Sequence, residues 1–334
     1  MKYNEYIMTC FLICCTIFLS TCSEEDILPD ENNDINYEYE ALLTDPTYSQ
    51  GFWLGSTDES NGDVQGQLDY DGAAVGTPVW KLAQWNCINN DMADAIYLVD
   101  GGVRIYQTAG GNKVSVDSSS GSISLELNTT SEYGLNGITS NPRRENEPWP
   151  TILIEYSLDE SHILKVANQK EIRMELAYCI DKVEDHIPTG QLNTDLHSAQ
   201  FQWFVTIQNR TAGSPDFGHY IWFGLNFYDK RYEYAPFYAA EDGGKENNTG
   251  AFIYMPDMKS IMGTQGGSKI GKNMKVDVNI LPIVKEAFKL AQQRNYLLNT
   301  TWDDLYIGAT NIGWEVTGTY NVAVTIQKIS LKYR

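Results

Sequence analysis

The segment His219-Tyr-Ile-Trp-Phe-Gly-Leu-Asn-Phe-Tyr-Asp229 has the alternation of a β-strand. Consecutive side chains of a strand point to opposite faces of its sheet, so the segment divides into two sets. One set is apolar and typical of a core face: Ile221, Phe223, Leu225 and Phe227. The other set combines aromatic rings, a gap and an amide: Tyr220, Trp222, Gly224, Asn226 and Tyr228. The pattern predicts a strand with one face on a core and one open face, which carries the groups that bind sugars.

Similar alternation recurs along the chain and predicts further strands. The predicted strands are Pro78–Trp85, Val103–Gln107, Ile123–Leu127, Ile152–Ser157, Glu171–Cys179, Gln200–Gln208 and a last strand from Tyr320 to Tyr333. The alternation of the last strand changes phase near Gln327, which predicts a β-bulge. One amphipathic helix is predicted at 280–293, where apolar residues recur with helical spacing. Strands with one apolar face indicate an all-β, antiparallel sandwich.

The size and charge of the chain limit its partners. At 334 residues with 42% hydrophobic residues, the chain has enough apolar side chains for a sizeable core. Its formal net charge of -20 repels the phosphates of nucleic acids and disfavours a polybasic contact with membranes. We therefore predict no nucleic-acid partner.

The first residues have the features of an export signal. Lys2 precedes an apolar run, Ile7–Leu19, that is too short to span a bilayer. The following Leu19-Ser-Thr-Cys22 resembles a bacterial lipobox, although Thr before the Cys is less usual than Ala or Gly. We predict a signal peptide at residues 1–21, lipidation of Cys22 and membrane contact through this anchor only. The alternative is an ordinary signal peptide that is cut nearby.

An acidic segment follows the predicted lipidation site. Ser23-Glu-Glu-Asp26 resembles the export tag of surface lipoproteins from glycan-foraging Gram-negative bacteria, which implies the outer membrane and the cell surface. No Lys or Arg occurs from Ser23 to Gln50, and Asp, Glu and Asn are frequent. Residues 22–50 are therefore predicted to be a disordered tether, and residues 51–334 a single β-sandwich domain.

The cysteines and possible metal ligands give few constraints. After processing, three cysteines would remain: the lipidated Cys22, Cys87 and Cys179. Cys87 and Cys179 would form either a disulfide or two buried thiols. No CxxC motif occurs and His is rare, so a zinc site is not expected. We predict no cofactor, and the one weak calcium candidate is a loop group: Asp242, Asn247 and Asn248.

Short motifs between Trp149 and Tyr333 carry a family resemblance. They are Trp149-Pro-Thr-Ile-Leu-Ile154, His197-Ser-Ala-Gln-Phe201, Tyr220-Ile-Trp-Phe-Gly224, Tyr228-Asp-Lys-Arg231 and Gly313-Trp-Glu315. This part of the chain, a little over half, resembles secreted surface lipoproteins with a concanavalin A-like jelly-roll sandwich. The resemblance implies that fold but no reaction, because the class holds lectins, carbohydrate-binding modules, glycoside hydrolases and polysaccharide lyases. The chain lacks the Glu-x-Asp-x-x-Glu cluster of well-known glucanases in this class and the Gln-Ile-His pattern of one lyase group.

The polar and aromatic face of the predicted sheet suggests a binding site for a poly- or oligosaccharide. Aromatic rings stack on sugar rings, and amides, carboxylates and guanidinium groups bind hydroxyl groups. The predicted ligand-binding residues are Trp222, Tyr220, Asn226, Tyr228, Arg231, Gln202, Arg173 and Glu175. The alternative is that another part of the chain covers this face and makes it a second core.

Two other functions stay open. A glycoside hydrolase needs two carboxyl groups about 5 to 9.5 Å apart, for which Glu155 and Glu175 are candidates. A polysaccharide lyase needs a base and a group that neutralises a uronate. The candidates are His197, His219, Tyr228 and Arg231, although each His also fits an ordinary strand end. An assembly or adhesion lipoprotein without a small ligand is the third possibility.

A long polar loop, 128–150, precedes the predicted strand at Ile152. It contains Arg143, Arg144 and Trp149. A loop of this length is either a functional rim of a binding site or a solvated connection whose arginines pair with nearby Glu residues.

Overall fold

The structure is a computed structural model that describes residues 38–60, 62–134, 140–158, 163–243 and 248–334. The predicted signal peptide, Cys22 and residues 22–37 of the predicted tether lie outside these ranges. Glu38–Arg334 form one compact unit. No helix in the described ranges is long and apolar enough to cross a membrane.

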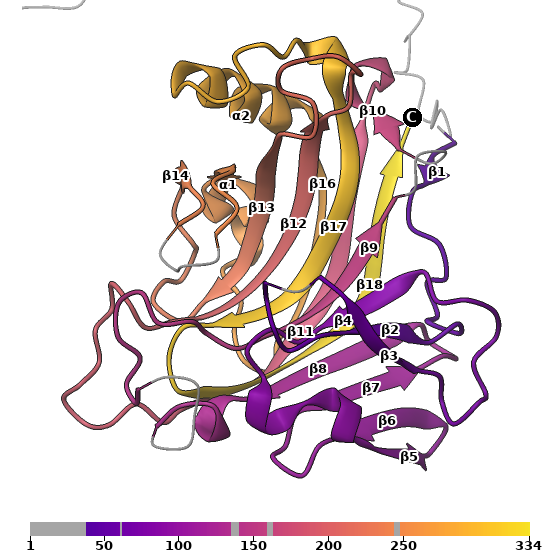
Figure 1. Ribbon diagram of the computed structural model, residues 1–334, viewed down its shortest axis with the longest axis vertical. Coiled ribbons are helices and arrows are strands. Elements are labelled where there is room, and N and C mark those ends of the chain that lie inside the picture. The colour runs from indigo at the N-terminus through magenta and orange to yellow at the C-terminus, as the bar shows by residue number, and fades with distance from the viewer. Residues whose placement is uncertain (1–37, 61, 135–139, 159–162, 244–247) are drawn as a thin grey trace, which may run out of the picture. The chain divides into compact units, whose positions relative to one another are not determined.

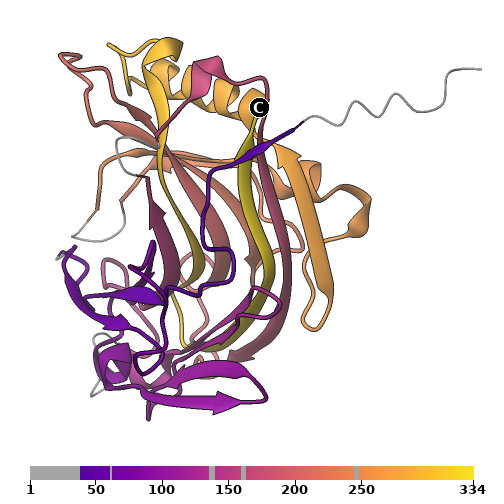
Figure 2. The same ribbon diagram turned by 90° about the vertical axis from the view of Figure 1, so that its right-hand side faces the viewer.

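Two β-sheets, called here the front sheet and the back sheet, make up the fold (Figures 1 and 2). The front sheet has the order β14 (Tyr238–Glu241), β15 (Phe252–Met255), β13 (Tyr220–Asp229), β12 (Ala199–Asn209), β17 (Leu305–Val316), β9 (Thr151–Ser157), β4 (Trp80–Ala83), β2 (Phe52–Gly55) and β3 (Val64–Leu68). β10 (Leu164–Lys165) pairs with β17. The strand pairs of this sheet are antiparallel, except for β13 with β15 and β2 with β4, which are parallel.

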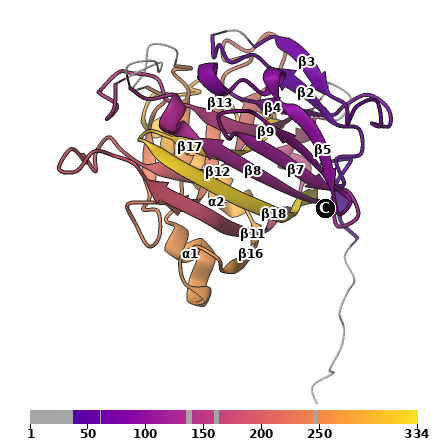
Figure 3. The same ribbon diagram turned by 90° about the horizontal axis from the view of Figure 1, so that it is seen from below.

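The back sheet has the order β16 (Asn273–Asn279), β11 (Ile172–Asp185), β18 (Tyr320–Tyr333), β8 (Ser122–Asn128), β7 (Lys113–Asp117), β6 (Val103–Gln107) and β5 (Ile96–Asp100). β1 (Glu40–Ala41) pairs with β18. Figure 3 shows β18 between β11 and β8. The predicted antiparallel jelly-roll sandwich is confirmed.

The predicted strands and the predicted helix are all present. Helix α2 (Leu281–Gln293) buries the stripe Val284, Ala287 and Ala291 and contacts β13. The remaining helical segments are α1 (Met258–Met262) and short 3-10 turns at Ile88–Asn90, Met92–Asp94, Thr129–Ser131, Val166–Asn168, Gly263–Gln265 and Trp302–Asp304.

The predicted bulge in the last strand is confirmed. Ala177 of β11 lies opposite Lys328, and the next residue, Tyr178, lies opposite Ile326. Gln327 is therefore the extra residue, which explains the change of phase in the sequence pattern.

The folded part of the chain begins before residue 51. Tyr48 is fully buried, and its ring lies 5.6 Å from that of Phe52 and 5.5 Å from that of Trp80. The Asp45 carboxylate accepts hydrogen bonds from the backbone N–H groups of Ser49 and Gln50. Residues 38–50, predicted as the end of the tether, thus belong to the packed sandwich. Pairing of β1 with β18 and burial of Leu42 and Tyr48 hold this segment in place.

Of the two alternatives for the cysteines, the structure has the free thiols. Cys87 and Cys179 are both buried and unbonded to each other. The Cys87 thiol donates to the Thr151 carbonyl at 3.3 Å, whereas Cys179 lies on β11 of the back sheet.

Candidate functional site

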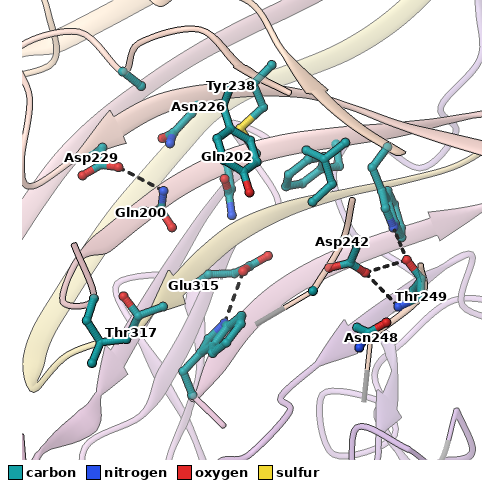
Figure 4. A pocket seen from close by; sticks show the side chains of 18 of the residues that line it. Gln200, Gln202, Asn226, Asp229, Tyr238, Asp242, Asn248, Thr249, Glu315 and Thr317 are labelled. Carbon is teal, nitrogen blue, oxygen red and sulfur yellow. Dashed lines mark hydrogen bonds between the residues drawn. The ribbon is translucent and has the colours of Figure 1, made fainter. Parts of the chain in front are cut away.

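A cleft of about 1140 Å³ lies over the exposed face of the front sheet (Figure 4). Strands β9, β12, β13 and β17 form its floor, and the connections before β9 and around β14 form its walls. The open face that the alternation of β13 predicts is therefore not covered by the N-terminal half or by the helix.

Cross-strand register arranges the floor in rows. In the first row, Gln200 of β12 lies between Glu315 of β17 and Asp229 of β13. In the second row, Gln202 lies between Gly313 and Asn226. In the third row, Phe204 lies between Asn311 and Gly224. The floor therefore changes from carboxylates and amides at one end to an aromatic ring at the other.

The two amides of the second row have unsatisfied oxygens. Gln202 and Asn226 are each 3% exposed and line the cleft. Among the described residues, neither Gln202 Oε1 nor Asn226 Oδ1 has a hydrogen-bond partner. Their neighbour Gly313 has to be glycine, because a Cβ there would lie 2.2 Å from the Ile152 carbonyl oxygen. In the second row, only Gln202 and Asn226 therefore have side chains on the floor of the cleft.

Aromatic rings form one wall of the cleft. The Trp222 ring packs edge to face against Phe204 at 5.7 Å and against Tyr220 at 5.1 Å. The Trp222 indole N–H donates to Thr249 Oγ1, which in turn donates to Asp242. Beside them, Phe237 and Tyr238 are 47% and 48% exposed. This wall offers a fixed indole and two accessible rings.

The long polar loop forms the opposite wall. The Arg143 guanidinium lies over the Trp149 ring at 4.8 Å, and its Nε donates to the Glu147 carbonyl at 2.7 Å. The Trp149 indole N–H donates to Glu315 at 3.3 Å. The loop thus reaches the cleft as a rim, but Arg143 itself is buried and holds Trp149 in place. Burial lowers the pKa of Arg143 from its usual value.

Asp229 is held by several donors at the polar end of the floor. Arg231 donates its Nε and Nη2 to the two carboxylate oxygens at 2.9 and 2.6 Å. Ser198 Oγ and Gln200 Nε2 also donate, at 2.7 and 3.0 Å. Burial alone would raise the pKa of Asp229, but the hydrogen bonds and charge of Arg231 outweigh burial and lower it. Asp229 is therefore ionised and orients the Gln200 amide.

Tyr228 does not line the cleft, so its predicted place is wrong. Phe201 pairs with Tyr228 while the next residue, Gln202, pairs with Asn226, which leaves Phe227 as a bulged residue. Phe227 and Tyr228 both point to the core, where the Tyr228 ring lies 6.0 Å from that of Trp314. The bulge turns Asp229 into the cleft in place of Tyr228.

Arg173 and Glu175 are also wrong as cleft residues, because they lie on β11 of the back sheet. Arg173 pairs with Asp277 and Glu171, and Glu175 pairs with Lys328 and Lys332. Glu155 does line the cleft, where it pairs with Lys81 at 2.8 Å. The predicted neighbourhood of Glu155 and Glu175 does not exist, since the two belong to different sheets.

The predicted lyase group is not assembled. His197 is buried, with Nδ1 accepting from the Asn193 N–H and Nε2 donating to the Arg143 carbonyl. His219 is exposed, 3.9 Å from Asp216, and neither His is among the described residues that line the cleft. Both histidines have the ordinary structural role that the sequence left open.

Four predicted ligand-binding residues meet in the cleft: Trp222, Gln202, Asn226 and Arg231. Tyr220 supports Trp222 from the side. Sequence reasoning missed Gln200, Phe204, Asp229 and Glu315 as site residues. Gln200 and Phe204 alternate with Gln202 on the same face of their strand and could have been found from it. No local sequence pattern indicates Asp229 or Glu315 as site residues.

Within the described ranges, no group of three or more His, Cys, Asp or Glu residues could hold a metal ion. Of the weak calcium candidates, Asn247 lies outside these ranges, and the Asp242 carboxylate accepts from the N–H and hydroxyl of Thr249.

No protein-family model and no curated protein matches this chain. Solved structures similar to it include a family 12 xyloglucanase from Bacillus licheniformis, at 12% identity and a TM-score of 0.42, which covers 75% of this chain and 100% of its own. An endoglucanase from Rhodothermus marinus has 8% identity and a TM-score of 0.39, over 72% of this chain and 96% of its own. A family 11 xylanase from Neocallimastix patriciarum has 12% identity and a TM-score of 0.35, over 76% and 100%. These are glycoside hydrolases, the class that the sequence analysis kept as its alternative, but similarity at this level transfers neither activity nor substrate.

Proposed function

We propose that the cleft binds a polysaccharide or oligosaccharide chain and that its main role is capture. The observation that carries this proposal is the pair of unsatisfied amide oxygens on Gln202 and Asn226. A buried acceptor without a partner costs about 1 to 3 kcal/mol, so a protein retains one only where something offsets the cost. Hydroxyl groups of a sugar are donors of the right kind.

The aromatic walls support the same ligand class. Sugar rings have apolar faces that stack on aromatic rings, and Trp222, Trp149, Phe237 and Tyr238 offer such rings around the amide floor. The volume, about 1140 Å³, is slightly above the 300 to 1,000 Å³ typical of small-molecule pockets. An extended chain of several sugar units fits this shape better than one monosaccharide.

Replacing Gln202 and Asn226 by Leu is expected to separate binding from stability. Leu removes two unsatisfied buried acceptors, so the free energy of unfolding is expected to stay the same or rise. Glycan affinity is expected to fall at least tenfold, about 1.4 kcal/mol, since the hydroxyl groups lose their acceptors. Urea unfolding and isothermal titration calorimetry measure the two effects.

Gln208→Leu is the matched control, because Gln208 lies on the same strand outside the cleft and its amide is bonded to Gly218 and Arg210. It is expected to lower stability and leave affinity unchanged. If the double Leu variant instead unfolds more easily and binds glycan like the wild type, the amides are structural and the proposal fails.

Hydrolysis is the second candidate, favoured by the first row of the floor. Glu315 and Asp229 flank Gln200, so their backbones are two strand spacings, about 10 Å, apart. Carboxyl groups of inverting glycosidases lie about 6.5 to 9.5 Å apart. Asp229 is held ionised by Arg231 and could act only as the base, which would leave Glu315 as the acid. Arg231, Ser198 and Gln200 already donate hydrogen bonds to the Asp229 carboxylate, which makes capture the stronger candidate.

One experiment tests both candidates: a glycan array on the soluble form that begins after Cys22, with product analysis of every hit. Shortened products that disappear in Glu315→Gln, while binding persists, would establish hydrolysis. Binding without products supports capture, and an array without any hit contradicts both.

We further propose that the mature protein is a cell-surface lipoprotein anchored through Cys22, on the strength of the lipobox-like sequence. Acyl chains contribute about 0.8 kcal/mol per buried methylene, enough for stable anchoring when two or more are present. Cys22→Ala is therefore expected to move the protein from the detergent phase to the aqueous phase on phase partitioning. Ser23→Ala should partition like the wild type, and recovery of Cys22→Ala in the detergent phase would contradict anchoring.

A further inference from the structure

The lining of the cleft is strongly acidic. Seven carboxylates line it: Glu59, Glu145, Glu155, Asp195, Asp229, Asp242 and Glu315. Among the described lining residues, the only cationic side chains are Arg143 and Arg231. The lining residues thus carry an excess of five negative charges, one of which is offset by Lys81 through its ion pair with Glu155. The formal net charge of the whole chain is also negative, at -20.

Neither guanidinium group is available to an anionic ligand. Arg231 directs Nε and Nη2 to the Asp229 carboxylate and Nη1 to the Thr194 carbonyl. Arg143 is 3% exposed, and its guanidinium is stacked on Trp149 while its Nε donates to backbone carbonyls. A ligand carboxylate or sulfate would therefore meet no available cation among the described residues that line the cleft.

The groups that are available suit an uncharged ligand. Gln202 and Asn226 are almost fully buried in the floor, and their oxygens lack partners. An amide is a neutral group that exchanges hydrogen bonds with hydroxyl groups, and an amide oxygen also accepts from an amine. These two side chains mark the cleft as a ligand site independently of its carboxylates.

We propose that the cleft selects glycans by charge: it accepts neutral and amine-bearing chains and repels chains that carry carboxylate or sulfate groups. This proposal rests on the proposed function, since it names the ligand class of the same cleft. Clefts lined by one sign of charge concentrate the field, so the excess of carboxylates in the lining acts together on a ligand ion. Salt screens this effect over a Debye length of about 8 Å at physiological ionic strength.

The test compares three soluble hexasaccharides that share one type of linkage: one of glucose, one of glucosamine and one of glucuronic acid. The comparison is repeated for several types of linkage. For every linkage that binds, the glucuronic acid chain is expected to bind at least tenfold more weakly than the glucose chain at low salt. The glucosamine chain is expected to bind at least as tightly as the glucose chain. Raising the salt to about 0.5 M, where the Debye length is about 4 Å, should narrow both differences.

A pair of variants links the selectivity to the cleft. Glu145 and Asp195 are exposed lining residues, so Glu145→Gln with Asp195→Asn should narrow the ratio of glucose to glucuronic acid affinities. The control, Glu184→Gln with Asp303→Asn, removes two exposed charges outside the cleft lining and should leave the ratio unchanged.

The outcomes separate the two proposals. Glucuronic acid chains that bind as tightly as glucose chains would overturn charge selection while leaving glycan binding intact. An equal change of the affinity ratio in the cleft variant and in the control variant would also overturn charge selection. The net charge of the protein, rather than the charges in the cleft, would then be responsible. If no chain of any charge binds, glycan binding itself fails and charge selection fails with it.

Discussion

Phe223→Ala is expected to lower the free energy of unfolding by about 3 to 5 kcal/mol, the usual cost of truncating a buried Phe. Phe223 is fully buried on the core face of β13, and its ring stacks on Tyr254 with centroids 6.2 Å apart. The substitution leaves a cavity in the core, on the face of β13 opposite to the cleft. Glycan affinity, measured on the fraction that remains folded, is expected to stay at the wild-type value.

Trp222→Ala, at the neighbouring position, is expected to do the reverse. It removes two edge-to-face ring contacts worth about 0.5 to 1.5 kcal/mol each, so the loss of stability should be about 1 to 3 kcal/mol. Glycan affinity should fall at least tenfold because a stacking platform is lost. Equal destabilisation by both variants, with no change in affinity, would show that Trp222 only supports the fold.

Asp229→Ala is the second substitution with a large expected effect, a loss of about 3 to 5 kcal/mol of stability at pH 7. Removing one member of a buried ion pair leaves the other charged and unpaired. Here Arg231 loses both of its carboxylate bonds, and Ser198 and Gln200 lose their acceptor. Urea unfolding at pH 7 measures the loss, and Arg231→Lys, which keeps the charge but loses the bidentate geometry, should cost less.

The pH dependence of stability tests the same carboxylate. The pKa of Asp229 is lowered in the folded state, so its contribution is present above its unfolded value of about 3.9. The contribution is lost as the pH falls from there through the folded pKa. Asp229→Asn should therefore show a smaller fall in stability between pH 5 and pH 2 than the wild type. A parallel fall in both proteins would mean that other carboxylates dominate acid unfolding.

The fold could be predicted from the sequence because alternation is a local property. Each predicted strand required only its own residues, and even the bulge at Gln327 appeared as a change of phase. The sheet to which a strand belongs depends on residues far apart in the chain, so the sequence pattern of a single strand does not indicate it. Arg173 and Glu175 therefore seemed to share a face with Gln202, although they lie on the back sheet.

The candidate site was predictable to the same extent. Trp222, Gln202 and Asn226 line the cleft because their strands alternate regularly up to those positions. The prediction for Tyr228 failed because the bulge at Phe227 has no Gly or Pro beside it that would mark it in the sequence. The first-row contact between Glu315 and Gln200 depends on pairing between residues more than a hundred positions apart, which alternation within one strand does not specify.

The bulge at Phe227 also makes the length of β13 as informative as its composition. Before the bulge, the residues of β13 that line the cleft have even numbers, Trp222 and Asn226, whereas Asp229 after the bulge has an odd number. Deleting the codon of Phe227 would restore regular alternation, and Asp229, then two positions after Asn226, would still face the cleft while Tyr228 stayed on the core face. Among proteins that share this sandwich, a carboxylate three positions after the amide with a bulge and a carboxylate two positions after it without one can thus occupy the same end of the cleft. A comparison of ungapped sequences, which places such carboxylates in different columns, would overlook their equivalence.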